Sequence, residues 1–255
     1  MSRRLVMALS FILFAAWAIP AQAEGDKFVK LLLKKGDKSF DERATKGKAE
    51  KARESYEKVL AVDSNNVEAR WKLARTLYWL GTHVDSKAEK MKLFETGIRY
   101  CQDAVKLDDK CVPCQFWLGV SYSKFGEAKG VLQSLGLVPY AREAMEKVKA
   151  MDEKYEAGGA YRVLGRIYNK LPGLKGGDNT KSIEYLKKAV KIGPKNLMNH
   201  RFLAEVLLDE GKKDEAKTVL EGIINTPDSD LLKAKIPEMK EERELAKKIY
   251  EKNFK

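Results

Sequence analysis

Residues 203–227 read LAEVLLDEGKKDEAKTVLEGIINTP, and this stretch decides the fold. Apolar and small residues recur in it at intervals of three and four, which is the period of a helix with one buried face. Gly211 closes the first such run, and Asp214-Glu215 opens the second, as helix stop and start signals do. The stretch therefore predicts two helices joined by a short turn.

The beginning of this stretch recurs along the chain as a signature of Leu, a small residue, two free positions, and Tyr or Leu. The four copies are Leu73-Ala74…Leu77, Leu118-Gly119…Tyr122, Leu164-Gly165…Tyr168 and Leu203-Ala204…Leu207. Each copy follows, by 14 positions, a small apolar residue near the end of a charged helix: Val59, Ala104, Ala150 and Ala189. A constant link of this kind predicts helix pairs repeated down the chain.

The last full unit resembles a tetratricopeptide repeat, in which small residues such as Ala204 and Ala216 let paired helices approach closely. Relative to it, the three earlier units carry 11, 12 and 5 extra residues between the signature and the second helix. We therefore predict an all-α fold, a tetratricopeptide-like helical-hairpin solenoid with insertions in the intra-repeat turns. Insertions on one edge of a solenoid either build a binding face or reflect drift in tolerant surface loops.

The N-terminal segment has the pattern of a secretory signal. Arg3 and Arg4 precede an apolar run, and Ala21-Gln22-Ala23 ends it. We expect cleavage after Ala23 and a soluble periplasmic protein; the alternative is an uncleaved membrane anchor. Residues 24–255 are then expected to form a single helical-repeat domain, with an N-terminal helix pair in residues 26–62 and a C-terminal capping helix in residues 228–255.

The chain is strongly basic. Its formal net charge is +12, and removal of residues 1–23 would lower this to +10. Such a balance favours anionic solutes, acidic proteins or phospholipid headgroups as partners, and export argues against nucleic acid. The alternative is that the lysines only solvate helix faces, since many of them alternate with Glu at helical spacing.

The first helices of such an array line its concave surface, so residues at fixed offsets from each signature Leu should point into a common groove. One end of this groove is predicted to be aromatic and the other cationic. Forked Arg donors suit carboxylates, and aromatic rings suit the apolar part of a ligand. The alternative is that the arginines pair with helix acids and the aromatics fill the core. The candidate groove residues are Trp71, Arg75, Tyr78, Phe116, Arg162, Arg166, Asn169, Lys170 and Arg201.

The odd number of cysteines suggests one disulfide and one free thiol in an oxidising compartment. Cys111 and Cys114 form a possible disulfide, although the pairing among Cys101, Cys111 and Cys114 is left open. Their Cys-x-x-Cys spacing also fits a thiol catalyst, but no strand-helix-strand pattern surrounds it. The two histidines lie far apart in the chain, without a cysteine or carboxylate constellation. We expect no catalytic residue, no metal site, no cofactor and no enzymatic activity.

Residues 158–178 contain two Gly pairs that bracket one helix, in the order Gly-Gly-x-x-Arg-x-Leu-Gly-x-x-Tyr-x-Lys-x-Pro-Gly-x-x-Gly-Gly-Asp. This stretch resembles the T-component associated with tripartite ATP-independent periplasmic (TRAP) transporters. Leu77-Tyr78-Trp79-Leu80-Gly81, the Met145-Glu146-x-Val148 helix and the Lys188-Ala189 to Pro194 turn support it. The resemblance covers roughly residues 28–225. This chain departs from the several lipoproteins among its members by lacking a lipobox Cys.

The resemblance implies an exported helical-repeat protein that accompanies the periplasmic solute-binding protein of a TRAP system. It also implies a small organic acid or apolar ligand and a possible homo-oligomer. Two other functions stay open. One is a scaffold that binds envelope proteins or peptides in its groove, and the other is a chaperone that uses Cys111 and Cys114.

Overall fold

The computed structural model describes residues 6–231 and 235–255, with side chains from Glu24 onward. Over these residues the chain forms helices and no strand. Residues 1–5 of the expected signal lie outside the described residues, and cleavage after Ala23 stays a prediction. Within the described part of the chain, no helix combines the length and hydropathy needed to cross a membrane.

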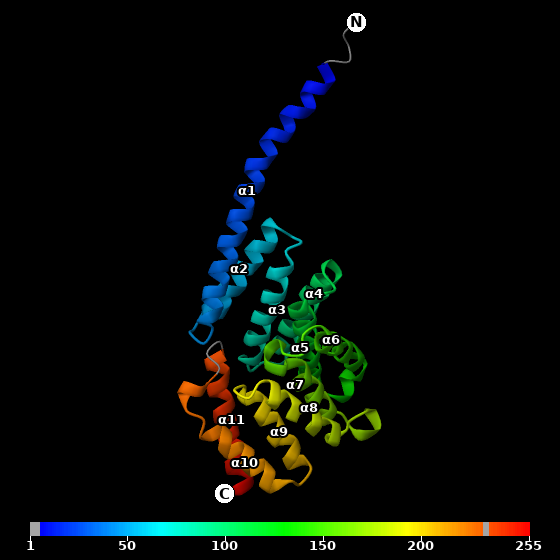
Figure 1. Cartoon of the computed structure of the whole chain (residues 1–255), viewed down its shortest axis with the longest axis vertical. Helices are drawn as coiled ribbons and strands as arrows, with labels where there is room; N and C mark the ends of the chain where they lie inside the picture. The colour runs from blue at the N-terminus through cyan, green and yellow to red at the C-terminus, as the bar shows by residue number, and fades with distance from the viewer. Residues whose placement is uncertain (1–5, 232–234) are drawn as a thin grey trace.

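The helices follow one another as hairpins stacked along the molecule (Figure 1). Helices α3, α5, α7 and α9, the first members of four successive pairs, also pack on one another and form one layer of the stack. The α-helices are α1 (Val6–Asp41), α2 (Lys48–Val62), α3 (Val67–Thr82), α4 (Lys87–Leu107), α5 (Val112–Lys129), α6 (Val138–Met151), α7 (Tyr155–Lys170), α8 (Asn179–Ile192), α9 (Leu197–Asp209), α10 (Lys213–Ile224) and α11 (Ile236–Phe254). Among the described residues, the short 3₁₀ helices are η1 (Leu132–Leu137), η2 (Gly173–Lys175) and η3 (Asp228–Asp230).

Side chains in the turns before α3 and α9 cap these two helices, whereas α7 begins without a side-chain cap. Asn66 Oδ1 accepts a hydrogen bond from the backbone N–H of Ala69 at 2.8 Å at the start of α3. Asn196 Oδ1 accepts from Met198 at 3.2 Å at the start of α9. Such caps satisfy backbone donors that have no partner inside the helix, so the helices begin where the turn residues predict.

The small residue of the signature lies where paired helices approach closely. A Cβ on Gly119 would lie 2.5 Å from Met145 and 3.2 Å from the Ala141 carbonyl oxygen. In the first and last copies, Ala74 and Ala204 are fully buried. The helical-hairpin solenoid predicted from these residues is confirmed.

The third link between helix pairs is longer than predicted. Val59, Ala104 and Ala189 are buried, but Ala150 is exposed. Val148 takes its structural place, because the C-cap residue Asp152 donates to the Val148 carbonyl just as Asp108 donates to Ala104. The additional residues are accommodated by an irregular turn near the start of α7, described below.

The extra residues of the earlier units are not all in loops. In the first unit most of them lengthen α3 and α4, which are joined by only residues 83–86. In the second unit they lengthen α5 and form η1, and in the third they form the turn that contains η2. Added helical residues keep their backbone hydrogen bonds, so extending the hairpin accommodates an insertion as well as a loop does.

Helix α11 connects the two ends of the stack. It packs on α9 and α10, as a capping helix would. It also reaches the N-terminal units, where Arg43 Nε donates to Glu238 Oε1 at 2.8 Å and His83 Nε2 lies 2.9 Å from Glu241 Oε1. The array is therefore closed on one side by its last helix. The division into a cleaved segment and a single domain stays a prediction.

Candidate functional site

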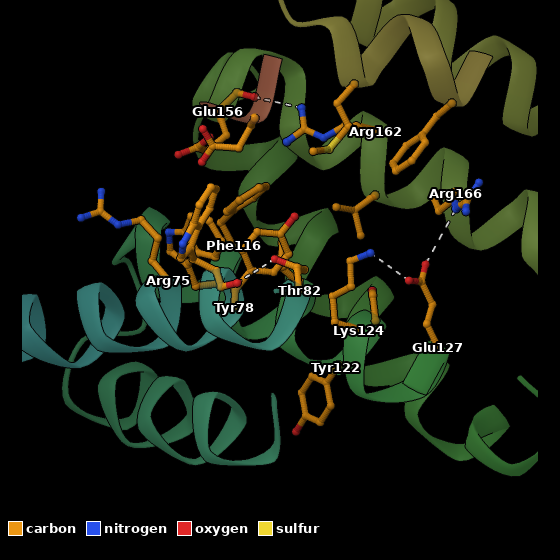
Figure 2. A pocket seen from close by; sticks show the side chains of 18 of the residues that line it. Arg75, Tyr78, Thr82, Phe116, Tyr122, Lys124, Glu127, Glu156, Arg162 and Arg166 are labelled. Carbon is orange, nitrogen blue, oxygen red and sulfur yellow. Dashed lines mark hydrogen bonds and ion pairs between the residues drawn. The ribbon is translucent and has the colours of Figure 1, made fainter. Parts of the chain in front are cut away.

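A cavity of about 470 Å³ lies between the layer of first helices and α11. Side chains from α3, α5, α7 and α9 line one side of it, and the first half of α11 lines the other. Figure 2 shows residues of α3, α5 and α7 pointing toward this common space. The cavity thus occupies the concave surface on which the groove was predicted.

Most of the predicted groove residues meet at this cavity. Trp71 and Asn169 do not line it. Trp71 instead lies beside two cations, with the guanidinium of Arg75 at 5.2 Å from its ring centroid. Asn169 donates hydrogen bonds to Asn179 at 3.1 Å and Asp209 at 2.8 Å, and these polar contacts hold it outside the cavity. The predicted residues that line the cavity are Arg75, Tyr78, Phe116, Arg162, Arg166, Lys170 and Arg201.

Contiguous aromatic rings form one wall of the cavity. Phe116 meets Trp117 edge-on, with 5.2 Å between ring centroids, and Tyr78 lies 5.5 Å from Trp117 in a tilted arrangement. Burial raises the pKa of the Tyr78 hydroxyl, so this group stays protonated. The wall offers an apolar surface that also carries the Tyr78 hydroxyl.

Arg162 brings a buried positive charge to the same cavity. Its side chain is 6% exposed, and its NH1 group donates to the Glu156 carbonyl oxygen at 3.2 Å and to Asn199 Oδ1 at 2.9 Å. Among the described residues it forms no ion pair with a carboxylate. Burial lowers the pKa of the guanidinium, against the opposing influence of Glu156 and Glu242, but Arg remains charged at neutral pH.

The backbone just before Arg162 in the chain makes a left-handed turn. Glu156, Ala157 and Gly158 have φ values of 53°, 57° and 76°, inside what is otherwise helix α7. A non-glycine residue in this conformation costs on the order of 1 kcal/mol, and such strain concentrates at functional sites. The turn directs the Glu156 carbonyl toward Arg162 and its carboxylate toward the cavity, where Lys235 pairs with it.

Asn199, on α9, holds this turn in place. The side chain is completely buried, and its Nδ2 group donates to the carbonyl oxygens of Ala157 at 3.0 Å, Ala189 at 2.9 Å and Gly193 at 3.2 Å. Its Oδ1 atom accepts from Arg162. One amide therefore links the left-handed turn, the end of α8 and the buried guanidinium.

The other cations of the cavity are paired with carboxylates. Glu127 lies between Lys124, at 2.8 Å, and Arg166, at 3.8 Å, as Figure 2 shows. Glu205 in turn pairs with both Arg166 and Arg201. Burial alone would raise the pKa of Glu127 and of Glu205, but the neighbouring cations lower both pKa values below their usual range. Arg166 and Arg201 therefore pair with helix acids, which is the alternative that the sequence left open for the groove arginines.

Arg75 differs from these paired cations. Its guanidinium lies 3.8 Å from the centroid of the Phe40 ring, and its buried Nε atom has no hydrogen-bond partner. Among the described residues, no carboxylate lies within ion-pair distance of it. Glu156 feels the charge of both Arg75 and Arg162, which contribute to its lowered pKa after Lys235. The cavity thus holds the guanidinium groups of Arg75 and Arg162, neither of which pairs with a carboxylate of the described residues.

The prediction missed the residues that complete the site from outside the repeats. Within the repeats, the offsets from the signature Leu do give Lys124, whereas Glu156 lies outside those offsets and was also missed. The contribution of α11 had no repeat signature, although its acidic and apolar residues share helical spacing. The cavity residues from α11 are Glu238, Met239, Glu241, Glu242 and Leu245.

The cysteines lie away from this chemistry. Cys111 and Cys114 form a disulfide at the start of α5, where Cys111 Sγ also accepts from the Cys114 N–H at 3.2 Å. Cys101 is a buried free thiol, and burial raises its pKa. In the described residues, no group of three or more His, Cys, Asp or Glu side chains is arranged to hold a metal ion.

The stacked hairpins and the concave cavity define a tetratricopeptide-like helical-repeat protein. Residues 32–170 match the family model described as regulator of microtubule dynamics protein 1-3, and the chain belongs to this family. TPR repeat-containing protein MJ1428 of Methanocaldococcus jannaschii is 28% identical over 183 residues, which are 72% of this chain and 29% of that protein. The chain thus spans under a third of the length of this curated relative.

Two solved structures share the fold. A thermophilic TPR protein, TTC0263 of Thermus thermophilus, superposes with a TM-score of 0.62 at 18% identity, covering 86% of this chain and 98% of that one. Pseudomonas aeruginosa pilF superposes with a TM-score of 0.55 at 15% identity, covering 91% and 94%. The matches support the tetratricopeptide part of the predicted resemblance, and none of them bears on a TRAP T-component.

Proposed function

We propose that this chain is a helical-repeat binding protein whose cavity takes a ligand with one carboxylate and an apolar body. The observation that carries this proposal is Arg162, a buried guanidinium on the cavity wall that pairs with none of the carboxylates in the described part of the chain. A buried charge is costly unless it is paired, whereas a carboxylate can accept two parallel hydrogen bonds from one guanidinium. A bound carboxylate would therefore complete this site.

The surroundings of Arg162 fit the rest of such a ligand. The aromatic wall of Tyr78, Phe116 and Trp117 lies in the same cavity and would cover an apolar body. Arg75 adds a second guanidinium to the same cavity and so increases its attraction for an anionic ligand. The other cavity cations already pair with carboxylates, so they add little to the attraction of an anionic ligand.

The test uses phenylbutyrate and decanoate as acids and the corresponding alcohols as neutral controls. Because a ligand that binds only the folded state stabilises it, the acids should raise the melting temperature of the chain. Arg162→Gln should abolish the shift, whereas Arg99→Gln, an exposed arginine on α4, should preserve it. Equal shifts with the alcohols, or an unchanged shift in Arg162→Gln, would overturn the proposal.

We further propose that the chain acts as an exported adaptor for a solute-binding protein of a TRAP system. Tetratricopeptide folds mediate protein–protein interactions in general. The finer assignment rests on the sequence alone, namely on residues 1–23 and on the Gly-bracketed stretch of residues 158–178. Periplasmic fractionation should recover a chain that begins at Glu24, together with a solute-binding protein. Recovery of a chain that begins at Met1 with cytoplasmic proteins only would contradict it.

A further inference from the structure

We infer that the surface covered by the first half of α11 is a docking site for an acidic amphipathic helix of a partner protein. In this view α11 is the internal occupant of that site. The inference concerns the mouth of the cavity and does not depend on a small ligand inside it.

The residues that α11 presents to this surface form one helical face. Glu238, Glu241, Glu242 and Leu245 are spaced by three, four and seven positions, which places them side by side on a helix. All four line the cavity, and Met239 beside them is buried. The occupant is thus a helix with three acids and an apolar residue along a single stripe.

The groups that receive these acids come from three separate parts of the array. Arg43 follows α1 and pairs with Glu238; His83 follows α3 and contacts Glu241. Arg201, on α9, donates to Glu242, with 3.2 Å between NH2 and Oε1. The surface therefore selects carboxylates by charge at both ends of the groove.

The chemistry of this contact favours exchange for another acidic helix. Of the 19 residues of α11, only Met239, Glu242 and Ala246 are buried. The cavity-facing acids of α11 are held by ion pairs, which are costly to break on one side but nearly neutral to exchange for equivalent pairs. Beside them, Met239 and Ala246 pack in a hydrophobic cluster with residues of α9 and α10, and a partner helix would have to replace these apolar contacts as well. A second acidic helix would replace the carboxylates that α11 places beside Arg43 and Arg201, whereas a neutral helix would supply no carboxylate at either position.

Because α11 belongs to the same chain, it competes with a partner at a high effective concentration. A free helix should therefore bind the parent chain weakly. Weakening α11 should strengthen binding of the free helix, although the substitutions lie outside the surface that the free helix contacts. This opposite response distinguishes a replaceable occupant from a permanent part of the fold.

The probe for the test is a fluorescent peptide of residues 236–254, titrated into the full chain with polarisation as the readout. The double variant Glu238→Gln/Glu242→Gln should bind the peptide about tenfold or more tightly than the parent chain does, because its internal competitor is weakened. Glu244→Gln is the matched control, since exposed Glu244 pairs with Lys247 inside α11. This control should bind the peptide as the parent does.

A charge exchange tests the pairing itself. In the α11-weakened chain, Arg43→Glu should lose most of the affinity for the native peptide and regain it with a peptide that carries Glu238→Arg. Circular dichroism checks that each variant is folded. If the double variant does not fold, Glu238→Gln alone replaces it, since the other α11 contacts then remain.

Three outcomes would overturn the inference. The first is that folded, α11-weakened chains bind the peptide no better than the parent does. The second is that a peptide with all three cavity-facing Glu changed to Gln binds equally well, which would make the surface apolar-selective. The third is dimerisation of the weakened chain without peptide binding, which would assign the surface to a second copy.

Discussion

Asn199 accepts a hydrogen bond from Arg162 across the α7–α9 contact, with 2.9 Å between Oδ1 and NH1. Its Nδ2 group reaches three backbone carbonyls at the same time. The position of the buried guanidinium is therefore tied to the left-handed turn of α7. This single amide connects the local backbone strain to the charge that we assign to ligand binding.

Asn199→Ala should lower the free energy of unfolding by about 3 kcal/mol, because the buried guanidinium loses its acceptor and the buried carbonyls lose their donor. Urea denaturation monitored by circular dichroism measures the loss. Asn253→Ala is the control, because Asn253 is exposed and donates only to Ile249 in its own helix. A loss below about 1 kcal/mol would show that the amide is not what holds the turn.

Gly193→Ala should also destabilise the third unit. A Cβ at this position would lie 2.4 Å from the carbonyl oxygen of Ala157, which is backbone and cannot rotate away. We expect a loss of about 2 kcal/mol, as overpacking of this kind produces. Gly222→Ala, in α10 with open space around its Cβ position, should instead raise stability slightly. Similar effects of both changes would contradict this explanation.

The sequence predicted the repeat well because the signature residues are set by local packing. Leu73, Leu164 and the small residues beside them are buried where paired helices cross, so their identity and spacing follow from the fold. The prediction of a 14-residue link was wrong only for the link that precedes Leu164, where Val148 takes the place expected for Ala150. There the left-handed conformation of Glu156 and Ala157 depends on Asn199, more than 40 positions later, and no local pattern encodes that contact.

The same reasoning explains the mixed result for the candidate site. The offsets from each signature Leu placed Arg75, Arg162 and Arg166 on the cavity because helical period fixes direction. They could not show that Arg166 has acidic partners and Arg162 does not, since those partners lie on other helices. The acids on α11 were missed because α11 lies outside the repeat.

Arg201 and Glu242 form a buried ion pair, and the cost of breaking it can be measured separately from the cost of removing both charges. Arg201→Met should cost about 3–5 kcal/mol, because it leaves the charge of Glu242 buried without its partner. The double variant Arg201→Met/Glu242→Met should recover much of this loss, since neither charge is then buried alone. Chemical denaturation of Arg201→Met, Glu242→Met and the double variant gives the coupling free energy between the two side chains. Additive losses would contradict a direct pair.

The contact between His83 and Glu241 should depend on pH. The hydrogen bond to Glu241 raises the pKa of His83 above 6.5, against the opposing effect of partial burial; Glu238 and the Trp79 carbonyl also raise it. His83 stacks on the Trp79 ring, with 3.9 Å between ring centroids, and the cation Arg43 lies 5.2 Å from the centroid of the same ring. A raised pKa means that the stabilisation is complete below pH 6.5 and is lost as pH rises through the folded-state pKa.

His83→Gln provides the measurement. The parent chain should be more stable than this variant near pH 5.5, and the difference should shrink by about pH 8.5, where imidazole is neutral. Thermal unfolding at both pH values tests this, with His200→Gln as the control, because His200 hydrogen-bonds to the Pro194 carbonyl and, among the described residues, has no carboxylate partner. A difference that grows with pH would reverse the sign and contradict the assignment.

The contact between Arg43 and Glu238 joins residues 195 positions apart in the chain. In an open solenoid each repeat touches only its neighbours, so unfolding can begin at either end and spread inward. Here the two ends protect each other, because loosening the first unit also removes a partner of the last helix. Loss of structure at one end is thereby transmitted to the other, and the linear array acquires the cooperativity of a globular protein.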